Sequence, residues 1–155
     1  MQASTVDHAL VEAFIRSSRA LVAVAARSLS DLDEEITLPQ YRALVVLAGR
    51  GSQRASDLSA ALGVTPGTGS RMIERLVRRG LVSRERSHGD RRALEVHLTD
   101  QGRDVVARVT RARAAEIARI LEAMPREGRA ALIAALGAFA DAAGEAGEQD
   151  WGLGW

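Results

Sequence analysis

The sequence lacks cysteine and lysine, and its 155 residues include only two Phe, one Tyr and two Trp. Without cysteine, the chain has no disulfide, no thiol chemistry and no thiolate ligand for a metal. Its three histidines are scattered, and no two have the spacing of a metal site. We therefore predict a protein with no metal and no other cofactor.

Long hydrophobic runs are also missing. No apolar stretch reaches the roughly 20 residues that a membrane-spanning helix needs, and the start of the chain has no basic run followed by an apolar core. We expect a cytoplasmic protein that makes no contact with a membrane. A length of 155 residues suggests one domain that can bury a core without disulfides.

The residue patterns of an enzyme are absent as well. The sequence shows no nucleophile beside a base and no paired carboxylates. The stretch TPGTGSRMIERLVRRG, residues 65–80, has two glycines near its start. It lacks the lysine of a phosphate-binding P-loop, and it lacks the third glycine and preceding strand of a dinucleotide-binding turn. We predict that the protein is not an enzyme.

Positive charge is concentrated in the middle of the chain. Residues 50–103 carry 11 arginines and 6 acidic residues, a net charge of +5. Residues 1–49 and residues 104–155 each have a net charge of −2. A basic block between mildly acidic flanks is typical of a segment that binds nucleic acid.

Apolar residues at helical spacing predict two helices before this basic block. The first covers residues 6–29. The second begins at Thr37, which forms a capping-box pattern with Gln40, and it ends at Gly49 or Gly51.

The next two helices have a helix-turn-helix pattern. The third lies within RASDLSAALG, residues 54–63, and GVT joins it to the fourth. Thr65 is a good N-cap for the fourth helix, Pro66 suits its first turn, and Gly80 ends it. Its apolar residues share one face and its arginines lie off that face, as in a helix that meets DNA.

A β-hairpin and two more helices complete the predicted order. LVSRERS and ALEVHLT read as strands around the charged turn HGDRR. Thr99 is expected to cap a long helix that runs to about Met124, and Pro125 is expected to begin the last helix. The final residues, 144–155, look like a flexible tail, and whether its Trp151 and Trp155 pack on the protein stays open.

This order predicts a mainly α protein with a winged helix-turn-helix, in which a two-stranded hairpin forms the wing. We assign residues 1–36 to an N-terminal helical region, 37–99 to the winged helix-turn-helix, 100–143 to C-terminal helices and 144–155 to the tail. The second helix of such a motif fits the major groove of DNA. A hairpin with arginines at its tip can reach the minor groove or the phosphate backbone.

Three stretches of the sequence carry a family resemblance: TLPQYRALVVLA, ASDLSAALGVTPGTGSRMIERLVRRGLVSR and GDRRALEVHLTDQG. They resemble the multiple-antibiotic-resistance regulator (MarR) family, and the resemblance runs from the first helix to about Ala143. The wing is its most specific part. The family pattern D-x-R-x-x-x-(apolar)-x-L-T is met by Asp90, Arg92, Val96, Leu98 and Thr99.

The resemblance implies a homodimeric transcription factor. The first helix and the last two would form the dimer, and each protomer would present one winged helix to a pseudo-palindromic operator. Many members are repressors released by a small aromatic or phenolic ligand bound between the dimer helices and the winged helix. The family usually has larger residues at Gly67 and Gly69, so we expect a loose first turn in the fourth helix until DNA orders it.

The expected DNA contacts lie on the fourth helix and the wing, since arginine and small polar residues there face the groove and the phosphates. They are Thr65, Gly67, Thr68, Ser70, Arg71 and Arg75 on the helix, and Arg84, Arg86, His88, Asp90, Arg91 and Arg92 on the wing. Thr65 is either a contact or only a cap. Arg54 is either a phosphate contact or a solvated side chain.

The first helix offers a further hypothesis. His8, Arg16 and Arg19 either border an effector pocket or belong to the dimer surface that the amphipathic stripe demands. Two other functions also stay open at this point. One is a metal-sensing winged-helix regulator without thiol ligands, and the other is a dimeric winged-helix interaction protein that has lost DNA binding.

Overall fold

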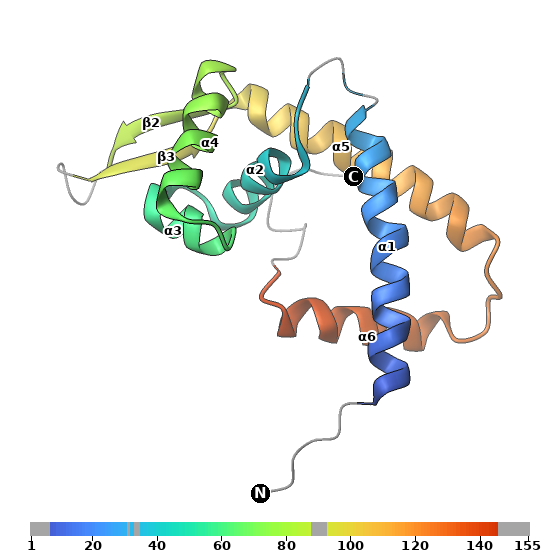
Figure 1. The fold of residues 1–155 in the computed structure, drawn as a ribbon. Coiled ribbons are helices and arrows are strands. Elements are labelled where there is room, and N and C mark those ends of the chain that lie inside the picture. Colours follow the sequence, from blue (N-terminus) through green and yellow to red (C-terminus); the bar gives the residue numbers. More distant parts are fainter. Residues whose placement is uncertain (1–6, 31, 33–34, 88–92, 146–155) are drawn as a thin grey trace, which may run out of the picture.

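The computed structural model describes residues 7–30, 32, 35–87 and 93–145. Figure 1 shows a head, made of α2, α3, α4 and a small sheet, and an arm, made of the helices α1, α5 and α6. The elements follow in the order α1 (His8–Ser30), α2 (Leu38–Arg50), β1 (Gln53–Arg54), α3 (Ala55–Ala61), α4 (Pro66–Arg78), β2 (Val82–Arg86), β3 (Leu94–Leu98), α5 (Asp100–Glu122) and α6 (Arg129–Ala142). The predicted mainly α winged helix-turn-helix is confirmed.

One apolar core holds the head together. Leu44 of α2, Leu76 of α4, Val96 of β3 and Val105 of α5 are each no more than 2% exposed. The first half of α5 therefore belongs to the core of the head, and its second half extends into the arm (Figure 1). This continuous helix joins the two parts of the molecule.

Two predicted helix caps are confirmed. The Thr37 hydroxyl accepts a hydrogen bond from the Gln40 backbone N–H at 3.4 Å, and the Gln40 side chain accepts one from the Thr37 N–H at 3.1 Å. At the start of α5, the Thr99 hydroxyl accepts from the Gly102 N–H at 3.0 Å and donates to the Gly80 carbonyl at 2.6 Å. Thr99 therefore ties the start of α5 to the turn that follows α4.

The sheet has one strand more than the sequence predicted. The expected hairpin is present, with β2 and β3 antiparallel and Val82 opposite Leu98. The two-residue strand β1 pairs with the other edge of β3, so the strand order is β1-β3-β2. A strand of two residues has no periodicity to detect, which is why sequence reasoning missed it.

The last helix begins later than predicted. It starts at Arg129 and not at Pro125, because Gly128 has a left-handed backbone (φ 83°) that ends the turn before it. The Arg129 guanidinium then donates to the Leu121 carbonyl at 2.8 Å and the Met124 carbonyl at 3.3 Å. The first residue of α6 thus satisfies carbonyls at the end of α5.

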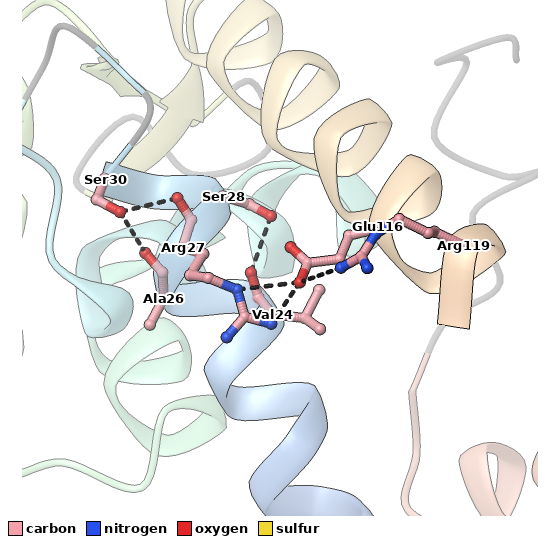
Figure 2. Close-up of polar contacts among 7 residues, drawn as sticks. All are labelled: Val24, Ala26, Arg27, Ser28, Ser30, Glu116 and Arg119. Carbon is pink, nitrogen blue, oxygen red and sulfur yellow. Dashed lines mark hydrogen bonds and ion pairs between the residues drawn. The ribbon is translucent and has the colours of Figure 1, made fainter. Parts of the chain in front are cut away.

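In the arm, α1 is joined to α5 by an ion pair that Figure 2 shows. Arg27 Nε donates to Glu116 Oε1 at 3.0 Å, and Arg27 Nη2 contacts the same oxygen. Arg119 lies 3.5 Å from that oxygen on the next turn of α5. The hydrogen bond from Arg27 lowers the pKa of Glu116, and the same bond raises the pKa of Arg27.

The arm leaves much apolar surface uncovered. The buried residues of α1 are confined to its last two turns, and α6 has no buried residue. Phe14 of α1 stacks on Phe139 of α6 with ring centroids 4.4 Å apart, yet Phe139 remains 53% exposed. Within the described ranges, no helix has both the length and the apolar character to cross a membrane.

Some predicted features lie outside the described residues. These are the wing-turn residues His88, Asp90, Arg91 and Arg92, and Trp151 and Trp155 of the tail.

Candidate nucleic-acid interface

The helix-turn-helix is fixed by a close contact between α3 and the first turn of α4. A Cβ added at Gly69 would lie 1.9 Å from Ser59 Oγ and 2.9 Å from Ser59 Cβ. Ser59 is 3% exposed, and its hydroxyl donates to the Ala55 carbonyl at 2.7 Å. Gly69 therefore has a packing role that the sequence did not reveal.

The start of α4 is capped and faces solvent. The Thr65 hydroxyl accepts from the Thr68 backbone N–H at 3.3 Å and donates to the Thr68 hydroxyl at 3.0 Å. The capping role of Thr65 is confirmed, and both threonines are exposed. A Cβ added at the exposed Gly67 would meet no atom within 4 Å, so the backbone there is open to a close approach.

The exposed face of α4 is cationic. Arg71 and Arg75 are exposed one turn apart, while Ile73 and Leu76 of the same helix are 1% and 0% exposed in the core. In the described part of the chain, neither arginine has a hydrogen bond or ion pair. Ser70 is half-buried beside them. Two unpaired guanidinium groups on one exposed face suit phosphate or guanine.

The wing extends this cationic surface. Arg84 and Arg86 are exposed on β2, opposite Val96 and Leu94 of β3. Burial decreases along the strands, since Val96 is 2% exposed and Leu94 is 56% exposed. The outer half of the wing thus leaves the core, and its arginines lie in solvent where a DNA backbone can reach them.

Arg54 lies on the edge strand β1 at the start of α3. It is exposed, and it pairs in register with Glu95 of β3. Glu95 accepts a hydrogen bond from the Ser52 hydroxyl at 3.1 Å. Hydrogen bonds from the side chains of Ser87 and Ser52 lower the pKa of Glu95, as do the charges of His97 and Arg54.

This group at the base of the wing was missed by sequence reasoning. Its only signal was Glu95 as a polar residue of an alternating strand. Ser52 precedes Glu95 by 43 positions, so only the sheet register brings the two side chains together.

A cavity of about 680 Å³ lies between the arm and the head. It reaches the helix-turn-helix itself, because Leu62, Val64 and Met72 line it. The other lining residues come from α1, α2 and α5 and from the segment after α6: Leu21, Val22, Ala25, Leu38, Pro39, Tyr41, Arg42, Val45, Arg113 and Glu145.

A second cavity, of about 530 Å³, lies between α1 and α6 around Phe14 and Phe139. His8, Arg16 and Arg19 are exposed on α1 and line neither of these two cavities. Their role at an effector pocket stays a prediction.

The cationic helix and the wing coincide with a known family pattern. The model of the MarR family matches residues 36–94. A solved structure of RV1404 from Mycobacterium tuberculosis is 41% identical in sequence, with a TM-score of 0.85 over 95% of this chain and 99% of that chain. The chain belongs to the MarR family. The family resemblance predicted from the wing and the helix-turn-helix is thereby confirmed.

Two further relatives bear on what the chain does. YkoM of Bacillus subtilis (strain 168), an uncharacterized HTH-type transcriptional regulator, is 28% identical over 77% of this chain and 78% of its own length. The structure of Streptococcus pneumoniae FabT in complex with DNA is 25% identical, with a TM-score of 0.67 over 87% of this chain and 96% of that chain. This MarR-family chain is therefore a transcriptional regulator.

Proposed function

We propose that this protein is a homodimeric repressor that binds double-stranded DNA through α4 and the wing. The observation that carries the proposal is the pair of exposed guanidinium groups, Arg71 and Arg75, on the outward face of a helix whose inward face is core. The described residues supply no anionic partner for either arginine. DNA phosphates and guanine edges are the partners that such a helix meets in the major groove.

The other contacts follow from position. Thr65, Gly67, Thr68 and Ser70 lie in the first turns of α4, where small residues and free backbone N–H groups can approach a phosphate. On the wing, Arg84 and Arg86 would follow the adjacent backbone, together with His88, Asp90, Arg91 and Arg92 of the wing turn. Arg54 would hold a phosphate from the other edge of the sheet.

The dimer is supported by the uncovered apolar surface of the arm. Exposed apolar patches larger than a few hundred Å² are typical of protein interfaces. The large apolar residues exposed on α1, on the end of α5 and on α6 are Leu10, Val11, Ile15, Leu21, Val22, Ile120, Leu121, Ile133, Leu136 and Phe139. A second copy that covers this face would place two winged helices on a pseudo-palindromic operator.

Release by a small aromatic or phenolic ligand is supported by the cavity between arm and head. A ligand in this cavity would touch Met72 of α4 and Leu62 and Val64 of the turn before it. It would act by binding the DNA-incompetent arrangement of the two heads more tightly than the competent one. The ligand would change the spacing between the two α4 helices, which must match one turn of DNA.

The test is a gel-shift titration of the protein on the DNA upstream of its own gene, repeated at several salt concentrations with unrelated DNA as competitor. We expect binding that survives the competitor and weakens steeply with salt. If neither this DNA nor any sequence selected from a random pool is bound specifically, the proposal is wrong. The alternative of a dimeric interaction protein would then be favoured.

A metal-sensing role has no such support. The described residues contain no group of three or more side chains that could hold a metal ion.

A further inference from the structure

The segment that follows α6 returns to the head and forms an ion pair there. Arg42 of α2 donates to both oxygens of the Glu145 carboxylate, Nη1 to Oε1 at 2.6 Å and Nη2 to Oε2 at 2.7 Å. Arg50 also donates to the Gly144 carbonyl at 3.4 Å. This bidentate pairing is the geometry in which a guanidinium group best recognises a carboxylate.

Glu145 lies among several cations. The Arg42 hydrogen bonds lower its pKa, and the charges of Arg42, Arg50 and Arg113 act in the same direction. Arg113 of α5 has a buried Nε atom with no hydrogen-bond partner among the described residues. One carboxylate therefore faces three guanidinium groups, one of which still has an unsatisfied donor.

Three of these charged residues belong to the lining of the cavity between arm and head. Arg42, Arg113 and Glu145 line it, and nearly all its other lining residues are apolar, including Leu21 and Val45. Apolar walls that include two arginines suit a ligand that has an apolar body and an anionic group. In the structure, the carboxylate on Arg42 is supplied by Glu145 itself.

We propose that Glu145 is an internal competitor that occupies the carboxylate position of the effector cavity, and that the effector is an apolar carboxylic acid whose carboxylate replaces Glu145 on Arg42 and also pairs with the unsatisfied donor of Arg113. This rests on the proposed function of a ligand-responsive regulator. The exchange breaks the contact between α2 and the segment that follows α6. A ligand would thus free the head from the end of the arm as it contacts Met72 of α4.

The expected size of the effect follows from occupancy. A site that is open for only a fraction of the time binds its ligand more weakly by that fraction. The pair is partly exposed, with side chains 43% and 39% accessible, so the competitor is displaceable. Removal of its charge should strengthen carboxylate binding by about tenfold, as for a site that is open about one-tenth of the time.

The experiment is calorimetric titration of the full chain, without DNA, using 2-naphthoate and its neutral counterpart 2-naphthamide as probes. The variants are Glu145→Gln, which keeps the shape and removes the charge, and Arg42→Gln. Glu122→Gln is the matched control, because it removes an exposed carboxylate at the end of α5. Thermal unfolding of each variant checks that it folds.

We expect Glu145→Gln to bind 2-naphthoate about tenfold more tightly than the wild type, with 2-naphthamide unchanged. Arg42→Gln should lose the preference for the carboxylate, and Glu122→Gln should match the wild type. Three results would each overturn the proposal: no gain in Glu145→Gln, an equal gain for both probes, or no binding of 2-naphthoate by any folded variant. Because no DNA is present, such a failure is separate from a failure of operator binding.

Discussion

At the scale of single residues, the two glycines of α4 differ in their surroundings. Gly69 packs against the buried Ser59, where an added Cβ would lie 2.9 Å from Ser59 Cβ, an atom that no side-chain rotation can move away. Gly67 faces open space. The expectation of one loose turn, drawn from the family resemblance, treated the two positions alike.

Substitution by alanine should separate them. We expect Gly69→Ala to lower the free energy of unfolding by about 1–3 kcal/mol, because α3 and α4 must move apart. Gly67→Ala should raise it by about 0.4–1 kcal/mol, because alanine restricts the unfolded chain and meets no atom in the helix. Denaturant unfolding followed by circular dichroism measures both. Equal stability of the two variants would contradict the packing role of Gly69.

The same two glycines show how much could be predicted from the sequence at this scale. Glycine in a helix interior is an unusual choice, and that much is visible in the sequence. The side chain that requires it belongs to Ser59, ten positions earlier on another helix, and only the crossing of α3 and α4 brings the two together. Close approaches of this kind are not encoded in any local pattern.

At the scale of the elements, the ion pair between α1 and α5 should make stability depend on pH. The pKa of Glu116 is lowered in the folded state from its ordinary value of 4.5. The pair therefore stabilises the fold fully above that ordinary value, and this contribution is lost as pH falls through the lowered pKa. The charges that face Glu116 are Arg27 from α1 and Arg119 from α5 itself.

Glu116→Gln tests this dependence. We expect the variant to be less stable than the wild type at neutral pH, and we expect the difference to shrink as pH falls below the ordinary pKa of a glutamate towards the lowered pKa of Glu116. Glu122→Gln, on the exposed last turn of the same helix, should show no such convergence. A stability difference between Glu116→Gln and the wild type that stays constant from neutral pH to about pH 3 would show that the pair does not stabilise the fold electrostatically.

Element boundaries show which signals are local. The Thr37 capping box and the Thr99 cap depend on residues three positions apart, so both could be predicted from sequence. The start of α6 could not, because Pro125 is a valid first-turn residue. What decided it was the left-handed backbone at Gly128 and the bonds of Arg129 to the end of α5.

At the scale of the whole molecule, the uncovered arm predicts an obligate partner. Ile133 of α6 is 73% exposed. We expect Ile133→Glu to weaken dimerisation and operator binding together, because a charge buried in an apolar interface is unfavourable. Sedimentation velocity measures the first effect. Gln101→Glu, which adds the same carboxylate on the head, should leave the dimer intact, and a wild type that sediments as a monomer would refute the arm as a dimer interface.

Only part of the candidate site could be predicted from the sequence. The cationic face of α4 follows from helical periodicity, and the arginines of β2 follow from strand alternation. The pair between Arg42 and Glu145 spans 103 positions and depends on how the chain returns to the head after α6. The sequence shows that both residues are charged, but it does not show that they form an ion pair.

The most direct test of DNA reading by α4 is a salt series of fluorescence-anisotropy titrations on an operator selected from random DNA. It compares wild type, Arg71→Ala and Arg126→Ala, the last removing an exposed arginine between α5 and α6. We predict that Arg71→Ala weakens specific binding by about 10- to 100-fold and that Arg126→Ala matches the wild type. Equal operator affinity of all three proteins across the salt series would contradict the account.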